Sequence, residues 1–196
     1  MLERVGEVMG TLHRHAEEYV RTQPVHRHRE TWKDLRVWAR EREDLADIYS
    51  YADCALLRAG ATRALAEIEA MEPEHDHGLI HADLHQYNYL FHGEEVRVID
   101  FDDCLFAPFT YDLAVTLWYL ASRPDYRALE GALLRGYERV RILPAGYRTH
   151  LPLLMLARTL GMVEWVLGWS SPTLLPWGPQ FLRNAPQGVR YYLDRI

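Results

Sequence analysis

Residues 81–100, "HADLHQYNYLFHGEEVRVID", place a β-hairpin within a chain whose other patterns are helical. The two strands are "YNYLF" at 87–91 and "VRVIDF" at 96–101, and the turn between them is "HGEE". Alternating apolar residues on both sides of a glycine-containing turn are typical of a hairpin. Acids, amides and imidazoles gather at its open end, so these polar residues are the first candidates for a functional site.

The rest of the chain shows the 3.6-residue period of amphipathic helices. Apolar residues recur there at steps of three and four, and proline, glycine and charge clusters separate the segments. These patterns predict an α+β, mainly α-helical fold with one small β-hairpin near residues 88–100, in a single domain over residues 1–196. The helical segments are residues 2–20, 32–56, 61–71, 111–121, 126–140, 151–167 and the tail from 180.

The hairpin brings oxygen-bearing side chains together. Pairing of Leu90 and Phe91 with the strand at 96–98 is expected to place Asn88 opposite Asp100, with Cα atoms about 4.5–5.5 Å apart. A carboxylate and an amide, completed by substrate phosphates, are enough protein ligands for Mg²⁺. Asp83 precedes Asn88 by five residues and can accept the proton of an incoming hydroxyl, as an aspartate does in phosphoryl transfer.

Several segments resemble the aminoglycoside phosphotransferase family of small-molecule kinases. The spacing from His81 through Asp83 and Asn88 to Asp100 has the layout of a kinase catalytic loop and metal-binding aspartate. The segments "LIHADLHQYNYLF", "VRVIDFDDC" and "YDLA" are similar to those of this family, which is related to choline and homoserine kinases and has a protein-kinase-like fold. The opening "VGEVMGTLHRH" is similar to the helix that begins the family's C-terminal lobe.

The resemblance implies ATP- and Mg²⁺-dependent transfer of a phosphoryl group to a hydroxyl of a small molecule. It also implies a role for each matching residue. Asp83 would be the catalytic base, Asn88 and Asp100 would hold Mg²⁺, His81 would support the loop, and Asp112 would start the helix packed beneath it.

The nucleotide-binding lobe of this family has no counterpart in the sequence. That lobe comes first in the family and carries a glycine-rich loop and a strand lysine, whereas here no G-x-G-x-x-G spacing occurs and the only lysine, Lys33, lies in the helical stretch "ETWKDLR". We therefore expect a C-terminal lobe alone, inactive in isolation, that self-associates or pairs with a missing nucleotide lobe. The alternative is a non-catalytic, kinase-like module that binds a small molecule or a protein.

Other interpretations of the same residues stay open. Asp83, Asn88 and Asp100 could be turn and cap residues of an ordinary hairpin, because Asp and Asn favour such positions. His81 fits a buried, hydrogen-bonded structural histidine better than a catalyst. Asp112 suits a helix N-terminal cap and a loop-ordering partner equally, and the two roles are compatible.

Three further residues have no single role. His85 lies in the loop and could face the substrate, while Asp102 and Asp103 could contact metal or substrate or be solvated. A zinc hydrolase is a competing hypothesis, but its histidines fall on an irregular loop, whereas zinc sites commonly place two histidines on one helix or strand face. The residues of that hypothesis are His75, His77, His81, Asp83 and His85.

Composition narrows the class of protein. The formal net charge of −6 and pI of about 5.9 do not favour nucleic acid or an anionic membrane as partner. The acids at Asp102 and Asp103, together with this net charge, lean towards a cationic acceptor such as an amino sugar or amine. Two distant cysteines match no metal or disulfide spacing, which makes a reducing cytoplasm the default. No signal peptide is evident, and the longest apolar run, residues 113–121, is shorter than the roughly 20 residues of a membrane span.

Overall fold

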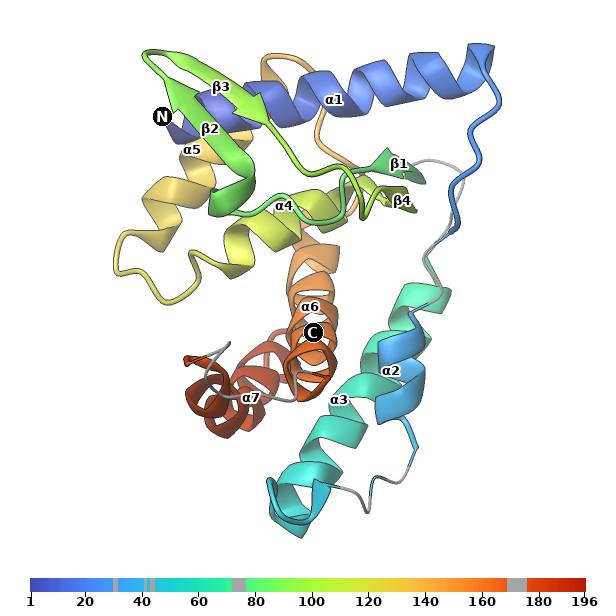
Figure 1. Ribbon diagram of the computed structural model, residues 1–196, viewed down its shortest axis with the longest axis vertical. Coiled ribbons are helices and arrows are strands. Elements are labelled where there is room, and N and C mark those ends of the chain that lie inside the picture. Colours follow the sequence, from blue (N-terminus) through green and yellow to red (C-terminus); the bar gives the residue numbers. More distant parts are fainter. Residues whose placement is uncertain (30–31, 41, 43–44, 72–76, 169–175) are drawn as a thin grey trace. The chain divides into compact units, whose positions relative to one another are not determined.

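The computed structural model describes residues 1–29, 32–40, 42, 45–71, 77–168 and 176–196 (Figure 1). Within it the chain forms two compact units. The first, here called the hairpin unit, is Met1–Glu30 with Glu72–Leu151, and the second, the helical unit, is Thr31–Met71 with Pro152–Ile196. That residues 1–196 act as a single domain stays a prediction.

The hairpin unit contains all strands of the described residues and the helices around them. The predicted hairpin is confirmed, and the described fold is α+β and mainly α-helical, as expected. The elements in chain order are α1 (Leu2–Thr22), β1 (His77–Ile80), a 3₁₀ turn (Gln86–Asn88), β2 (Tyr89–His92), β3 (Glu95–Val98), β4 (Leu105–Pro108), α4 (Phe109–Trp118), α5 (Tyr126–Glu138) and the start of α6 (Tyr147–Leu167).

The register of the hairpin differs from the predicted one by a single residue. His92 pairs with Glu95 across a two-residue turn, in which Gly93 has a φ of +59°. Counting back along both strands places Asn88 opposite Ile99, and the Ile99 N–H donates to the Asn88 carbonyl at 3.1 Å. The expectation that Asn88 lies opposite Asp100 is therefore wrong, since Asp100 lies one residue beyond that pair.

A second strand pair, β1 with β4, was not predicted. It is antiparallel and pairs Ile80 with Leu105. Each strand has only four residues, and they are far apart in sequence, so no local pattern announces them. They form because Ile80, Leu105 and Phe109 bury their side chains in one small apolar cluster, which fixes the ends of the segment between them.

Helices α1 and α5 pack closely enough to require glycine at the contact. A methyl group on Gly6 would overlap the Leu133 carbonyl, and one on Gly136 would overlap the Glu3 carbonyl. The buried face of α1 includes Met9. Because this face covers the hairpin unit from one side, α1 is placed to reach the polar loop described below (Figure 1).

The helical unit consists of α2 (Lys33–Trp38), α3 (Tyr51–Glu69), most of α6 and α7 (Gly178–Leu193). Helix α3 begins at a Ser50 cap, whose Oγ accepts from the Asp53 N–H at 3.1 Å. Helix α6 is long and apolar enough to span a membrane by those two criteria, but 61% of the tested window is buried inside the structure, as in the core helix of a soluble protein.

Candidate active site

The polar loop, residues 81–88, leaves β1 through a backbone conformation that is unusual for a side-chain-bearing residue. Ala82 has a φ of +68°, in the left-handed region that favours glycine. Two hydrogen bonds to one buried carboxylate hold it there: the Ala82 N–H donates to Asp112 Oδ1 at 2.7 Å, and the His81 N–H donates to Asp112 Oδ2 at 3.0 Å. The strained residue lies directly before Asp83, so its conformation sets where Asp83 points.

Asp112 orders this loop from within α4. Its side chain is fully buried, and it receives a third hydrogen bond from His13 Nε2 at 3.0 Å. It does not cap the helix, because α4 begins at Phe109 and its N-cap residue is Pro108. Of the two roles considered from the sequence, helix N-terminal cap and loop-ordering partner, the structure shows the second.

His13 is a site residue that the sequence analysis missed. It lies on α1, 1% exposed, and joins Asp112 on one side to the Tyr137 hydroxyl, 2.9 Å from Nδ1, on the other. Arg141 donates to the same hydroxyl at 3.1 Å, so the hydroxyl donates to Nδ1 and His13 Nε2 carries the proton given to Asp112. A signal existed, because His13 falls four residues after Met9 on the apolar face of α1.

The His81 ring ties the loop to the end of β3. It is 3% exposed, its Nδ1 accepts from the Asp83 N–H at 3.3 Å, and its Nε2 donates to the Ile99 carbonyl at 3.0 Å. These partners require the neutral form with the proton on Nε2. The ring also lies against Phe101, with centroids 4.8 Å apart. The prediction of a buried, hydrogen-bonded histidine is confirmed.

Asn88 and His85 both direct hydrogen-bond donors at the Asp83 carboxylate. Asn88 Nδ2 donates to the Asp83 carbonyl at 2.9 Å and to Oδ2 at 3.2 Å, and His85 Nε2 lies 3.2 Å from the same Oδ2. His85 Nδ1 accepts from the Tyr87 N–H, so Nε2 carries the proton. With its side chain 20% exposed, Asp83 is both oriented and accessible.

Helix α4 also holds the polar loop at its centre. The Thr116 hydroxyl donates to the Leu84 carbonyl at 2.6 Å, and the Tyr89 hydroxyl donates to Thr116 Oγ1 at 3.1 Å. Burial raises the pKa of Tyr89 above its usual value, so this phenol remains a donor. Neither Thr116 nor Tyr89 was predicted from the sequence to support the loop.

Asn88 and Asp100 fit a magnesium ion by the chemistry of their oxygens. The Asn88 amide nitrogen is committed to Asp83, which turns the amide oxygen away as a free acceptor. Asp100 is exposed, has a φ of +65°, and makes no side-chain hydrogen bond or ion pair in the part of the chain that the structure describes. Two such oxygens suit Mg²⁺ when a ligand's phosphates supply the others.

No larger metal-binding group exists among the described residues. Nowhere in them do three or more His, Cys, Asp or Glu side chains gather to hold a metal. His75, part of the zinc hypothesis, lies outside the described residues. A metal at this site would therefore depend on few protein ligands and on the oxygens of its substrate.

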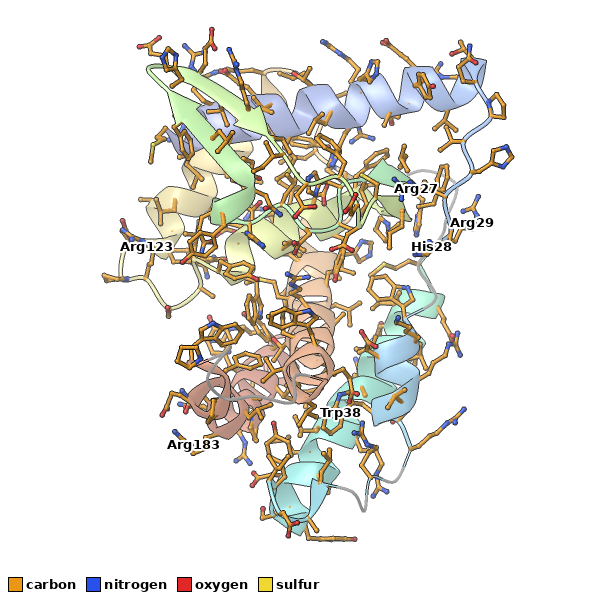
Figure 2. The ribbon with its side chains drawn as sticks, viewed as in Figure 1. Arg27, His28, Arg29, Trp38, Arg123 and Arg183 are labelled. Atoms are coloured by element: carbon orange, nitrogen blue, oxygen red, sulfur yellow. The ribbon has the colours of Figure 1, made fainter. Side chains whose placement is uncertain are left out.

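Asp102 and Asp103 are exposed on the segment that follows Asp100. The Asp102 backbone carbonyl accepts from Arg27 Nη1 at 3.2 Å, which leaves both carboxylates to solvent or to a ligand. Figure 2 shows Arg27 and Arg29 beside this part of the hairpin unit.

Residues 26–29, which are exposed, also extend the small sheet. The Phe106 N–H donates to the His28 carbonyl at 3.0 Å, and Arg29 forms a parallel bridge with Phe106. The Arg29 guanidinium lies 5.5 Å from the Phe106 ring centroid. Backbone pairing with β4, which no local pattern predicts, thus orders part of this segment.

The family model of the phosphotransferase enzyme family (APH) matches residues 1–153. The chain belongs to this family. Among curated relatives, the homoserine kinase of Granulibacter bethesdensis is 33% identical over 76% of this chain and 46% of its own length. The homoserine kinase of Beijerinckia indica is 30% identical over 83% of this chain and 51% of its own length. The chain thus spans about half the length of such relatives.

Solved structures show the same fold at lower identity. A microcompartment-associated aminopropanol kinase superposes with a TM-score of 0.80 at 24% identity, covering 98% of this chain and 62% of that one. The choline kinase LicA from Streptococcus pneumoniae superposes with a TM-score of 0.61 at 14% identity, covering 97% of this chain and 63% of that one. These small-molecule kinases share the arrangement of elements described above.

Proposed function

We propose that residues 1–196 form the C-terminal, catalytic-loop lobe of a cytoplasmic small-molecule kinase that uses ATP and Mg²⁺. The observation that carries this proposal is the setting of Asp83: one carboxylate oxygen receives donors from Asn88 and His85, in a loop held by buried Asp112. A carboxylate fixed in this way, in a chain of the phosphotransferase family, suits a base that receives the proton of an acceptor hydroxyl.

The proposed reaction is an in-line displacement at phosphorus. The acceptor hydroxyl oxygen bonds to the γ-phosphorus as the bond from that phosphorus to the bridging oxygen breaks, and the hydroxyl proton passes to Asp83. Asn88 and Asp100 would hold Mg²⁺, which would neutralise phosphate charge. His81 and Asp112 keep the loop in place and take no part in proton transfer.

The surface beside Asn88 suits the base of a nucleotide. Leu90 lies two residues after Asn88, Ile99 pairs with Asn88, and their side chains are 50% and 40% exposed. Exposed apolar side chains next to metal-binding oxygens support a ligand that has both a flat apolar ring and phosphates. ATP is such a ligand.

The acceptor that we propose is a small amino alcohol or a related amine. The relatives and neighbours named above are kinases of homoserine, aminopropanol and choline, all of which carry both a hydroxyl and a nitrogen. Exposed Asp102 and Asp103 after Asp100 would favour a cationic group there. Nucleic acid and membrane lipid are not proposed as partners.

In this proposal, the remaining contacts to ATP come from a nucleotide-binding lobe that is not part of these 196 residues. The sequence contains no glycine-rich loop. Lys33, its only lysine, is exposed at the first residue of α2, so it lies on a helix and not on a strand. Catalysis by positioning requires both reactants to be held, so residues 1–196 alone should not turn over substrate. The alternative remains a module that binds the acceptor, or another protein, without catalysis.

The test compares two variants of the chain with a nucleotide-binding lobe supplied, in cis or as a second chain. Asp83→Asn should lower phosphorylation of an amino alcohol by about 10²–10⁴-fold while leaving nucleotide affinity nearly unchanged, because the base acts on the acceptor. Asp100→Asn should weaken binding of the magnesium–nucleotide complex. Asp125→Asn, a substitution in an exposed ion pair with Arg123, is the matched control.

Two outcomes would contradict the assignment. An equal loss of nucleotide affinity in Asp83→Asn and Asp100→Asn would show that their roles are not distinct. If the unsubstituted protein binds an amino alcohol but transfers no phosphoryl group with the second lobe present, the non-catalytic alternative holds.

A further inference from the structure

A row of hydrogen-bonded polar side chains, here called the polar row, runs through the hairpin unit and ends at the polar loop. Its outer end is Glu17 on α1, and its inner end is Asp112 on α4, the carboxylate that holds the loop. Arg141, Tyr137 and His13 lie between them in that order, each hydrogen-bonded to the next. The row forms because α1 packs along α5 (Figure 1), which brings together His13 and Tyr137, 124 positions apart in the sequence.

Arg141 is a fixed donor in the outer half of the polar row. Its Nη2 and Nε donate to the two carboxylate oxygens of Glu17 at 2.8 and 3.3 Å, and its Cζ lies 4.2 Å from the centroid of the Phe109 ring. Its Nη1 donates to the Tyr137 hydroxyl at 3.1 Å. Because a guanidinium has no acceptor, the tyrosine oxygen accepts this bond, and its single proton is left for another acceptor.

The inner half of the polar row fixes the orientation of the His13 ring. Nδ1 accepts from the Tyr137 hydroxyl at 2.9 Å, and Nε2 donates to Asp112 Oδ2 at 3.0 Å. A half-turn of the ring about its Cβ–Cγ bond would place carbon atoms against both partners. Since His13 and Tyr137 are 1% and 0% exposed, water has no access to replace either bond, and the two contacts together select one orientation.

The His13 ring and the polar loop share one carboxylate. Asp112 Oδ2 accepts from His13 Nε2 and from the His81 N–H, and Oδ1 accepts from the Ala82 N–H. Without a fixed donor at His13, the Asp112 carboxylate can turn, and the two loop amides lose their alignment with it. Ala82, at a φ of +68°, depends on that bond to stay in the left-handed region, because a strained backbone persists only where its surroundings hold it.

We propose that Tyr137 and His13 are positioning residues for Asp83. The Tyr137 hydroxyl orients the His13 ring, which holds the Asp112 carboxylate. That carboxylate in turn holds the backbone directly before Asp83. Neither Tyr137 nor His13 takes part in proton transfer. The role of Asp83 as the base rests on the proposed function, whereas the effect of the polar row on the loop does not.

Amide hydrogen exchange of the 196-residue chain measures the effect of Tyr137→Phe. Removing the hydroxyl should accelerate exchange at His81 and Ala82 about five- to tenfold, as expected for the loss of one buried hydrogen bond. The NMR signals of the His13 ring nitrogens provide a second readout. The Nδ1 signal should shift, because this nitrogen loses its hydrogen-bond donor. Unchanged exchange at both amides would overturn the proposal.

Tyr147→Phe is the matched control. Tyr147 is 4% exposed, and its hydroxyl also donates one hydrogen bond within the hairpin unit, to Glu130 Oε1 at 3.2 Å. Because this bond lies outside the polar row, its loss should lower the thermal unfolding midpoint as Tyr137→Phe does but leave exchange at Ala82 unchanged. Equal acceleration at Ala82 in the two variants would overturn the proposal, since the effect would then be general destabilisation.

Two substitutions at His13 separate hydrogen bonding from packing. His13→Gln keeps an N–H for Asp112 and a carbonyl oxygen for Tyr137, whereas His13→Leu fills similar space with neither. Exchange at Ala82 should stay close to that of the unsubstituted chain in His13→Gln and accelerate in His13→Leu. Equal exchange in the two would overturn the role of the hydrogen bonds. If His13→Leu does not fold, slower exchange in His13→Gln than in Tyr137→Phe gives the same decision.

Turnover with a nucleotide-binding lobe supplied connects the polar row to Asp83. Tyr137→Phe should lower kcat about five- to tenfold and leave nucleotide affinity nearly unchanged, because it misplaces the base and catalysis depends on position. Unchanged kcat in Tyr137→Phe, together with lost turnover in Asp83→Asn, would overturn the positioning role and leave the proposed function intact. Full turnover in Asp83→Asn would instead contradict the proposed function, while exchange and NMR would still decide whether the polar row holds the loop.

Discussion

The buried Asp112 carboxylate is the support whose loss should loosen the polar loop most directly. Its two oxygens accept hydrogen bonds from three donors. Oδ1 accepts from the Ala82 N–H, and Oδ2 accepts from the His81 N–H and from His13 Nε2. Asp112→Asn keeps the size of the side chain but leaves one acceptor oxygen. In its better orientation that oxygen faces His81 and His13, and the new amide nitrogen faces the Ala82 N–H.

The expected cost follows from this count of donors. The Ala82 N–H and the new amide N–H₂ that faces it both lack an acceptor, which costs at least about 1–3 kcal/mol, and the two remaining bonds lose the help of a charge, which adds roughly 1 kcal/mol. We therefore expect Asp112→Asn to lower the free energy of unfolding by at least about 2–4 kcal/mol. Asp112→Ala would strand all three donors at about 3–9 kcal/mol, close to the whole stability of a typical domain, so asparagine is the usable change.

Urea unfolding followed by circular dichroism measures this cost, and amide hydrogen exchange at His81 and Ala82 shows where it arises. Exchange at Ala82 should accelerate most, because that amide loses its acceptor and its backbone is strained. Asp125→Asn is the control with the same chemistry at an exposed position and should leave the urea midpoint unchanged. A loss below about 0.5 kcal/mol with unchanged exchange would refute the view that Asp112 holds the loop.

Three further outcomes are expected. Gly136→Ala should lower the free energy of unfolding by about 2–3 kcal/mol, because its methyl group would overlap the Glu3 carbonyl. Gly131→Ala on the same helix should leave the free energy of unfolding unchanged, because its methyl group meets only the flexible end of a side chain. Equal effects of the two substitutions would contradict the close packing of α1 on α5. Burial raises the pKa of Cys104 to about 11, so iodoacetamide at pH 8 should label it more slowly than half-buried Cys54 in a mass-spectrometric time course; equal rates would show that the thiol is accessible. Calorimetric titration of the 196-residue chain with ATP and Mg²⁺ should give millimolar or weaker binding, about −4 kcal/mol at most, whereas micromolar binding would show that a nucleotide lobe is not needed.

The features predictable from sequence are those that local chemistry specifies. The hairpin follows from alternating apolar residues around Gly93, and the helices follow from their 3.6-residue period. The spacing of Asp83 and Asn88 puts both in one short loop whatever the rest of the chain does. Residues this close in sequence meet in space at little entropic cost. For this reason the family resemblance can be recognised from this segment alone.

Only the tertiary structure decided which distant groups complete the site. His13 reaches Asp112 across 99 residues, and β1 pairs with β4 through side chains buried in a shared cluster. The hairpin register also differs by one residue from the expected pairing, so Asn88 lies opposite Ile99 and not opposite Asp100. These contacts form between segments that meet only when the helices pack and bury their donors and apolar faces. The periodicity of a single segment therefore does not predict them.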